Sequence, residues 1–306
     1  MESGKKVLIA GGSGLIGNHL AQKLREKHYH VSILTRKKNK DSVFEQFTWD
    51  INKGYIQDQA FDRTDYLINL AGTGIADARW TKQQKQKIRD SRLVSSKLLF
   101  EYIRNLKHKP KAFITASAVG YYGSITSEHI FNETDQVGVD FLADVCKKWE
   151  DASLKFESLG VRTVILRTGV VFDKTQGAFP KMTQSLKYGF VAGIGSGKQY
   201  IPWIHIDDLI SMYHYSIENE KIRGIYNAVS PEHCNQDELT KRIKIITKKI
   251  KFPNLPGILL KVFFGEMSSI LLNGSRITSG KIIKTGFKFK FEKIEDALLV
   301  LLKKNI

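Results

Sequence analysis

Apolar residues follow two alternating patterns along the chain. Short, almost uninterrupted apolar runs, typical of strands buried on both faces, occupy residues 5–10, 30–35, 65–70, 112–116 and 161–166. Apolar positions spaced by three or four residues predict helices over 15–27, from about 81 to 106 and over 141–159. This alternation predicts an α/β fold with a doubly wound parallel sheet, whose ligand crevice lies at the carboxyl ends of the strands.

A glycine-rich loop, GGSGLIG at residues 11–17, joins the first predicted strand to the first predicted helix. Its first glycine permits a sharp turn, its middle glycine lets backbone N–H groups approach a pyrophosphate, and its last lets the helix pack closely against the strand. Because the loop follows an apolar strand and opens an amphipathic helix, it indicates a dinucleotide site rather than an ordinary tight turn.

The end of the second predicted strand indicates which dinucleotide is preferred. An acid about 20 positions after the glycine loop accepts the ribose 2′-hydroxyl of NAD, whereas an arginine accommodates the 2′-phosphate of NADP. This chain has Thr35, Arg36, Lys37 and Lys38 here, and no acid. We therefore predict NADP in preference to NAD; the alternative is that the basic residues only begin a charged loop.

Composition and charge narrow the function classes. The 306 residues are 42% apolar, which is enough for a substantial core, and the two cysteines, Cys146 and Cys234, show neither a disulfide framework nor zinc-ligand spacing. Without a recognisable secretory signal or spanning segment, we expect a cytoplasmic protein with no metal and no membrane partner. The net charge of +17 favours polyanions, but Lys and Arg are spread along the whole chain, so no specific nucleic-acid partner is expected.

Several spaced motifs resemble the short-chain dehydrogenase/reductase superfamily: the glycine loop, NLAG at 69–72, Ser117, and RTGVV at 167–171. WIHIDD at 203–208 is similar to its extended, sugar-nucleotide-epimerase-like branch. More narrowly, the chain resembles one atypical family, often labelled epimerase or cell-division-inhibitor-like. This resemblance rests on residues 74–76, 79–80, 90–92, 117–123 and 149–150, and on a tail from Gly265 to Phe289. It spans essentially the whole chain.

The resemblance implies a Rossmann-type domain over residues 1–250 with substrate-side insertions from about 173 to 203, and a small C-terminal region, 251–306, packed on the substrate side. The implied cofactor-binding residues are Gly11, Gly12, Ser13, Gly14, Leu15, Ile16, Gly17, Thr35, Arg36, Lys37, Leu70, Ala71, Gly72, Ser117, Ala118, Arg167, Thr168, Gly169 and Val170. Relatives often dimerise through helices, so a homodimer is an expectation for which the residues give no signal of their own.

The candidate substrate-binding residues are Arg79, Trp80, Arg92, Gln199 and Trp203. Guanidinium groups near the start of the long helix are suited to an anionic small-molecule substrate. The alternative is a salt-bridged, aromatic-packed loop, and the sequence does not decide between the two.

The catalytic pair of most such proteins, Tyr-x-x-x-Lys, is missing. On the helix where it belongs, the two places fall on Phe141 and Val145 or on Leu142 and Cys146, which supply neither a proton donor nor an ammonium. The remaining catalytic candidates are Ser117, Tyr121, Tyr122 and His205. Packing is the alternative for each tyrosine, and local hydrogen bonding is the alternative for the histidine.

Two main hypotheses follow. In the first, the protein is an NADP-dependent oxidoreductase or epimerase-like enzyme that acts on an unidentified small molecule. In the second, it is a non-catalytic NADP(H)-binding module that senses redox state and acts through a protein partner. A third, polyanion binding through the basic surface, predicts an affinity that falls steeply with salt.

Overall fold

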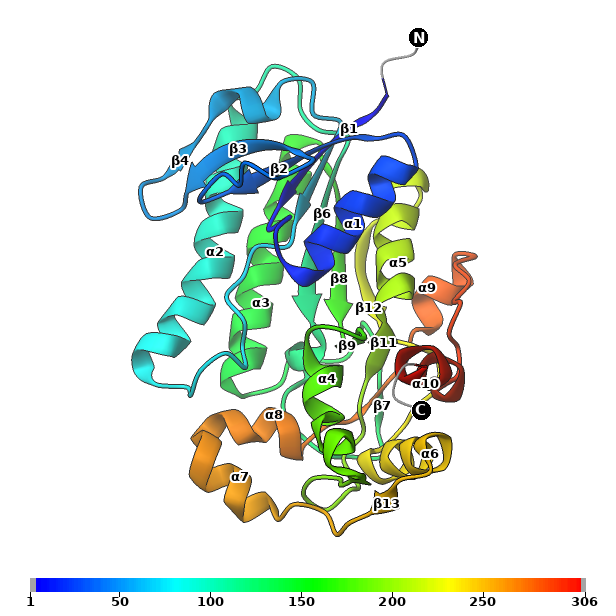
Figure 1. Cartoon of the computed structure of the whole chain (residues 1–306). Coiled ribbons are helices and arrows are strands. Elements are labelled where there is room, and N and C mark those ends of the chain that lie inside the picture. The colour runs from blue at the N-terminus through cyan, green and yellow to red at the C-terminus, as the bar shows by residue number, and fades with distance from the viewer. Residues whose placement is uncertain (1–3, 304–306) are drawn as a thin grey trace.

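The computed structural model describes residues 4–303 and centres on an eight-stranded sheet of order β12-β8-β6-β5-β1-β2-β3-β4, shown in Figure 1. Neighbouring strands are parallel except for the antiparallel pair β3 and β4. The sheet strands are β1 (Lys6–Ala10), β2 (His30–Thr35), β3 (Glu45–Asp50), β4 (Tyr55–Ile56), β5 (Tyr66–Asn69), β6 (Ala112–Ala118), β8 (Arg162–Thr168) and β12 (Gly224–Ala228). The predicted doubly wound α/β fold is confirmed.

Helices cover both faces of this sheet. On one face, α1 (Leu15–Glu26) and α5 (Ile206–Glu218) bury Leu20, Leu24 and Leu209 against Val7 and Ile9. On the other face lie α2 (Lys82–Arg104) and α3 (Phe141–Leu154), and α2 buries its apolar stripe against β1, β5 and β6. The chain therefore fills two layers around one buried, Val- and Ile-rich sheet, as its apolar runs predict.

Three strands of the sheet, β3, β4 and β12, were not predicted from the sequence. In β3 the buried residues are Phe47 and Trp49, which alternate with polar residues that are only partly buried. This alternation is the signal of a strand with one buried face, and it differs from the continuous apolar runs of the interior strands.

The remaining segments build a lower lobe beneath the carboxyl ends of the strands in Figure 1. Its helices are α4 (Ala178–Met182), α6 (Gln236–Thr247), α7 (Gly257–Phe264), α8 (Ser269–Leu272) and α10 (Ile294–Leu302). Helix α9 (Gly280–Lys284) instead packs beside β12 of the main sheet. Three short pairs of parallel strands join segments that are far apart in the sequence. They are β9 (Val170–Phe172) with β11 (Trp203–His205), β10 (Phe190–Val191) with β13 (Ile250–Lys251), and β7 (Ile130–Phe131) with β14 (Arg276–Ile277). Short 3-10 helices occur at η1 (Asp58–Phe61), η2 (Val119–Tyr122), η3 (Lys155–Leu159), η4 (Gln184–Tyr188) and η5 (Gly265–Ser268).

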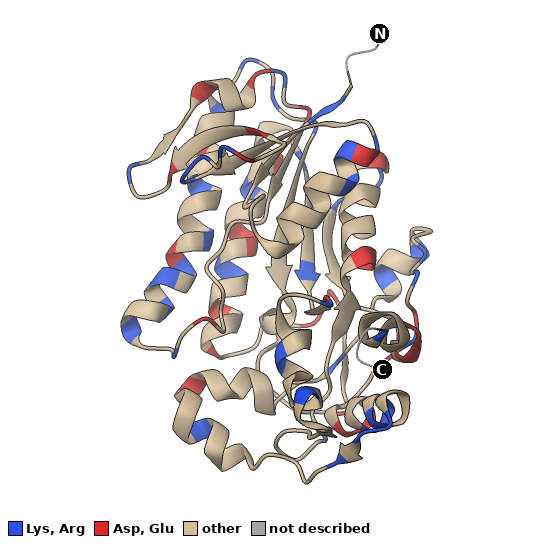
Figure 2. Ribbon diagram, in the orientation of Figure 1, with Lys and Arg blue, Asp and Glu red and all other residues tan. Residues whose placement is uncertain are grey.

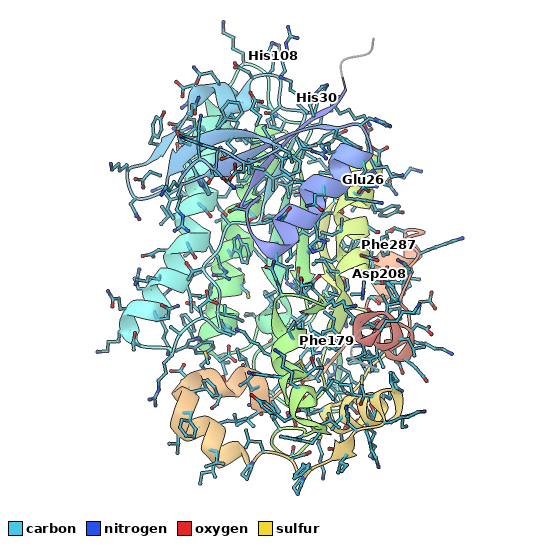
Figure 3. The ribbon with its side chains drawn as sticks, in the orientation of Figure 1. Glu26, His30, His108, Phe179, Asp208 and Phe287 are labelled. Carbon is cyan, nitrogen blue, oxygen red and sulfur yellow. The ribbon has the colours of Figure 1, made fainter. Side chains whose placement is uncertain are left out.

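The last part of the chain packs into the same core as this lobe. Leu298 of α10 belongs to one apolar cluster with Phe172, Phe179 and Trp203. The buried carboxylate of Asp208, labelled on α5 in Figure 3, accepts hydrogen bonds from the backbone N–H groups of residues 290 and 291, at 2.7 and 2.9 Å. The C-terminal segment is therefore held to the lower lobe by apolar contacts and to α5 by hydrogen bonds.

Basic residues are distributed over many elements. In Figure 2, Lys and Arg mark the outer side of α2 and the surface of α6, whereas most of the α7 ribbon carries no charge. Within residues 4–303, no helix combines the length and the apolar character needed to cross a membrane.

Candidate functional site

The glycine loop lies where the strand order reverses, between β1 and β5. Gly11 follows β1 with φ +82°, and a Cβ atom there would come within 2.7 Å of the Leu70 carbonyl group after β5. The two loops thus touch through backbone atoms, and a side chain would separate them. This switch point is where open α/β sheets bind their ligands.

The start of α1 is open to a ligand. Its N-cap residue is Gly14, no side chain caps the helix, and its first turn has no acidic residue. A Cβ on Gly14 would have only one neighbour, the Gly11 oxygen at 3.4 Å, whereas one on Gly17 would collide with the backbone of residues 11 and 12. The loop is therefore closed towards the protein and open towards the crevice, and the helix N-terminus favours an anion there.

Three cations follow β2, the strand next to β1. Leu34 pairs with Ala10 in the parallel register, so the chain after Thr35 leaves the sheet beside the glycine loop. The Lys37 N–H donates to Thr35 Oγ1 at 3.3 Å and turns the chain, and Arg36, Lys37 and Lys38 are exposed. None of the three forms an ion pair with a carboxylate of residues 4–303.

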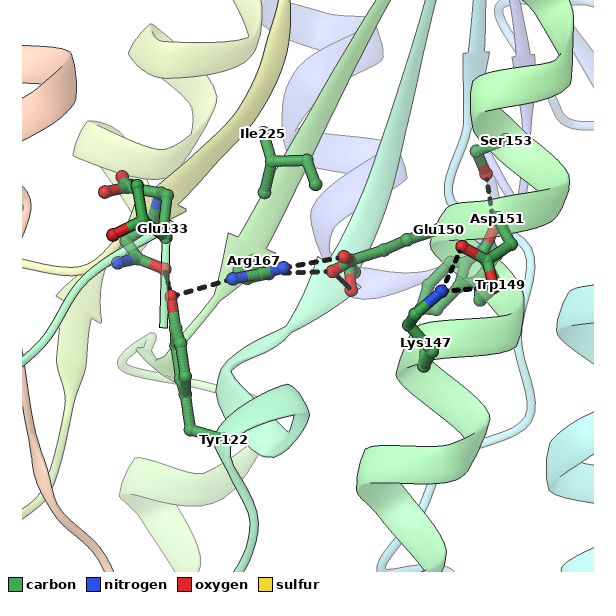
Figure 4. A network of polar contacts seen from close by, with 12 residues as sticks. Tyr122, Glu133, Lys147, Trp149, Glu150, Asp151, Ser153, Arg167 and Ile225 are labelled. Carbon is green, nitrogen blue, oxygen red and sulfur yellow. Dashed lines mark hydrogen bonds and ion pairs between the residues drawn. The ribbon is translucent and has the colours of Figure 1, made fainter. Parts of the chain in front are cut away.

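A buried polar network lies at the carboxyl ends of β6 and β8 (Figure 4). Ser117 Oγ donates to Glu150 Oε1 at 2.7 Å, and Arg167 holds both carboxylate oxygens, with Nε at 2.9 Å from Oε1 and Nη2 at 2.8 Å from Oε2. Arg167 Nη1 donates to the Tyr122 hydroxyl at 3.0 Å, which in turn donates to Asn227 Oδ1 at 2.6 Å. The side chains of Glu150 and Arg167 are 3% and 1% exposed, so this pair is almost completely removed from water.

Burial and charge shift the pKa values of this network in opposite directions. Burial raises the pKa of Tyr122 to about 12, against the opposing effect of the Arg167 guanidinium. Burial alone would lower the pKa of Arg167, but the hydrogen bonds and the charge of Glu150 outweigh it and raise that pKa. Tyr122 is therefore neutral and Arg167 charged across the ordinary pH range.

The neighbouring tyrosine is placed differently. The Arg167 Cζ lies 3.4 Å from the centre of the Tyr121 ring, which is only partly buried. The two tyrosine rings meet edge to face at 5.5 Å. The structure thus brings Ser117, Tyr121 and Tyr122 together around one guanidinium.

The places of the missing Tyr-x-x-x-Lys pair are filled by packing. Leu142, Val145 and Cys146 are buried, and burial raises the pKa of the Cys146 thiol to about 12. Glu150 lies one helical turn beyond Cys146 and reaches Ser117. Neither Glu150 nor Asn227 was predicted as a site residue. The signal for Glu150 was its place in the apolar stripe of α3, where a carboxylate needs a partner.

Of the predicted substrate residues, Arg79 and Trp80 lie just before α2 and Arg92 lies in the middle of that helix. Arg92 donates from Nη1 to the carbonyl oxygens of Thr73 and Ile88, each at 3.0 Å, and burial lowers its pKa. Trp80 donates from Nε1 to the Ile75 oxygen at 2.8 Å. Arg79 is exposed, with its Nε 3.1 Å from the position of a Cβ on Gly265.

The other predicted residues lie in the interior. Trp203 is 1% exposed and donates from Nε1 to the Glu232 oxygen at 3.1 Å. Gln199 is 2% exposed and donates to backbone oxygens of residues 194 and 271. His205 caps α5, since its Nδ1 accepts the N–H of Asp207 at 3.1 Å, and its ring packs 4.0 Å from that of Phe291.

A pocket of about 840 Å³ opens in the lower lobe, between the turn at 195–196 and helices α7 and α8. Its lining includes Ile258, Lys261, Gly265, Glu266 and Leu272. Lys85 of α2 forms an ion pair with Glu266, so the pocket adjoins the loop that carries Arg79.

Comparisons with known proteins cover almost the whole chain. The model of the NAD dependent epimerase/dehydratase family matches residues 7–228, and that of a domain of unknown function, DUF1731, matches residues 255–300. An epimerase family protein of Staphylococcus saprophyticus is 34% identical, over 96% of this chain and 98% of its own length. The epimerase family protein YfhF of Bacillus subtilis is 33% identical, over 97% of each chain.

Solved structures give the same picture. The crystal structure of the human epimerase family protein SDR39U1 with NADPH is 28% identical, has a TM-score of 0.86, and is matched over 98% of this chain and 99% of its own. The UDP-glucuronic acid 4-epimerase of Bacillus cereus, solved with UDP-glucuronic acid and NAD, has a TM-score of 0.79 over 98% of both chains. At 18% identity, the latter likeness concerns the fold alone.

Proposed function

This chain belongs to the NAD dependent epimerase/dehydratase family, and from that premise we propose that it binds NADP(H) and acts as an oxidoreductase or epimerase-like enzyme on a small molecule. The observation that carries the proposal is the uncapped start of α1 at Gly14, beside the exposed cations after β2. The helix start suits the pyrophosphate of NADP, and the cations suit its 2′-phosphate. The human relative was solved with NADPH.

The residues around the crevice fit this cofactor. The N–H groups at the start of α1 would hold the pyrophosphate, and Arg36 with Lys37 would hold the 2′-phosphate. Loops 70–72, 117–118 and 167–170 would line the rest of the cleft. NADP(H), when bound, supplies or accepts a hydride at its nicotinamide ring.

Within this proposal, Tyr121 is the proton partner of the reacting oxygen. The Tyr122 hydroxyl already accepts from Arg167 and donates to Asn227, whereas Tyr121 is partly exposed and its ring lies against the Arg167 guanidinium. The cation–π contact of the Arg167 guanidinium with the face of the Tyr121 ring would hold the phenol in place. Ser117 and Glu150 would position Arg167. His205 would act only as the N-cap of α5.

An anionic substrate would meet Arg79 first. Arg92 is committed to two backbone oxygens and holds the loop at Thr73, whereas Arg79 is exposed beside the pocket of the lower lobe. We therefore assign anion binding to Arg79 and loop positioning to Arg92.

Calorimetric titration of the full chain with NADPH and NADH tests the cofactor. We expect Arg36→Ala to weaken NADPH binding by about tenfold or more and to leave NADH unchanged, because only the 2′-phosphate pairs with the guanidinium. Lys53→Ala removes an exposed charge from the turn between β3 and β4 and is the matched control. Binding of neither nucleotide would overturn the proposal.

One observation favours the non-catalytic alternative. Ser117, Glu150, Arg167 and Tyr122 bond to one another, a closed arrangement that a purely structural network also adopts. Oxidation of NADPH followed across a panel of carbonyl compounds separates the two functions. Turnover that Tyr121→Phe abolishes supports the enzyme, and NADPH binding without turnover of any compound supports a redox-sensing module.

A further inference from the structure

Helix α7 lies on the outside of the lower lobe but is made of apolar residues. Its sequence is GILLKVFF over Gly257–Phe264, and Leu260 is its only buried residue. Ile258, Val262 and Phe263 are 70%, 63% and 69% exposed. Monomeric soluble proteins seldom expose a contiguous patch of this kind unless it binds something.

Other elements at the same end of the molecule carry further exposed apolar residues. Ile245 on α6, Ile250 on β13 and Phe252 after it are also exposed. β10 pairs with β13, and the rings of Phe190 and Phe252 meet at 4.7 Å, which brings exposed Tyr188 to the same end of the molecule. We call this the α7 surface; it consists of Tyr188, Ile245, Ile250, Phe252, Leu255, Ile258, Leu259, Val262 and Phe263. Its segments α6, β13 and α7 lie at the lower end in Figure 1.

Cations outnumber anions around this surface, and the flanking acids Asp237 and Glu266 are paired with Lys251 and Lys85. Residues 241–265 contain seven Lys or Arg and no Asp or Glu: Lys241, Arg242, Lys244, Lys248, Lys249, Lys251 and Lys261. Arg242 pairs with Glu232 and Lys251 with Asp237. The other five form no ion pair within the part of the chain that the structure describes.

We propose that the α7 surface docks on an anionic lipid bilayer, with its apolar side chains among the lipid headgroups and acyl boundary and its lysines against the lipid phosphates. Such interfacial binding combines buried apolar area with attraction of Lys side chains to anionic lipid. The long lysine stems add apolar contact while their ammonium groups stay in the polar layer. Charge decides against a second copy of the chain, since face-to-face pairing would bring two sets of unpaired lysines together.

The proposal departs from the expectation that the protein has no membrane partner. That expectation rested on the lack of a spanning segment, and a surface that lies on a bilayer needs none. The proposal is independent of the cofactor, because the α7 surface lies in the lower lobe and includes none of the crevice residues.

Co-sedimentation of the full chain with vesicles tests the proposal, using phosphatidylcholine alone or mixed with phosphatidylglycerol. We expect binding to the mixed vesicles and little to phosphatidylcholine alone. The variant Ile258→Glu/Phe263→Glu should bind at least about tenfold more weakly, because it loses apolar insertion and gains repulsion. Both positions are exposed, so unchanged thermal unfolding is the check on folding.

The matched control is Val43→Glu/Val94→Glu, which makes the same charge change at exposed positions before β3 and on α2. It should keep most of the binding. An equal loss of vesicle binding in both variants would show that net charge alone causes it, and would overturn the proposal. Wild-type protein that ignores both vesicles but forms a dimer, broken only by the α7 variant in sedimentation velocity, would assign the surface to a second copy instead.

Discussion

Glu150 and Arg167 are two buried charges whose other polar partners, Ser117 and Tyr122, are neutral. Their side chains are 3% and 1% exposed, and each charge is matched by the other. Bringing such a pair out of water costs free energy, so its net stabilisation is small, but removing one partner leaves the other charge buried and uncompensated.

Replacement of Glu150 by Gln should therefore lower the free energy of unfolding by about 3 kcal/mol or more. Lys147→Gln, on the same helix, breaks the exposed pair with Asp151 and should cost about 0.5 kcal/mol or less. Urea unfolding followed by circular dichroism measures both. Similar losses in the two variants would mean that the interior does not depend on the ion pair.

The glycines of the loop have separable roles. A Cβ on Gly17 would collide with the backbone of Gly11 and Gly12, whereas one on Gly14 faces the crevice. Gly17→Ala should destabilise the fold by about 2 kcal/mol. Gly14→Ala should leave thermal unfolding almost unchanged and weaken NADPH binding in calorimetry. A Gly14→Ala protein with unaltered NADPH binding would place the pyrophosphate elsewhere.

At the scale of elements, α5 begins with an unusual cap. Its N-cap is His205, and only an unprotonated Nδ1 can accept the Asp207 N–H. Burial lowers the pKa of His205 below its ordinary 6.5; Lys290 and His19 also lower it, and Asp207 and Asp173 oppose them. The pKa of a second histidine of α5, His214, is also lowered, chiefly by burial.

This shift makes stability depend on pH. The folded state binds the His205 proton less tightly than the unfolded chain does. The contribution of His205 to the free energy of unfolding is therefore complete above about pH 6.5 and is lost as pH falls through the pKa of the folded state. His205→Asn keeps a capping oxygen but cannot titrate, so its free energy of unfolding should fall less steeply from about pH 7 to 5. The variant also loses the contact with Phe291, which lowers its stability at every pH. The test is therefore the slope of the free energy of unfolding against pH, and equal slopes in the two proteins would contradict the expectation.

At the scale of the whole molecule, the C-terminal region completes a core that earlier segments begin. Residues of α10 share one apolar cluster with Phe172, Phe179 and Trp203, and Asp208 is bonded to backbone N–H groups at 290 and 291. Without this region those apolar side chains would face water, although the glycine loop and β1 would be unchanged in sequence.

A chain cut after residue 250 should therefore fail to fold into a soluble monomer, even though it retains the whole eight-stranded sheet. Soluble yield and the cooperativity of thermal unfolding, compared with the full chain, measure the effect. A soluble fragment with a sharp transition and NADPH binding would show instead that residues 1–250 fold on their own.

Much of the fold was readable from local pattern. Continuous apolar runs mark β1, β5 and β8 because a strand covered on both faces must be apolar throughout. Strand β3, the second from the edge of the sheet, was missed because only Phe47 and Trp49 turn inward, and α7 was missed because it has no polar face from which to read a period.

The sequence by itself determined the five central strands of the sheet, the glycine loop and the lack of a Tyr-x-x-x-Lys pair, since each depends on residues close together in the chain. Only the tertiary structure decided what stands at the site. Tyr122 and Asn227 are 105 positions apart, and Ser117 and Glu150 are 33 apart, and they meet because their strands and helix are packed in one register. A contact between distant side chains depends on where packing places both backbones, and no local pattern encodes that position.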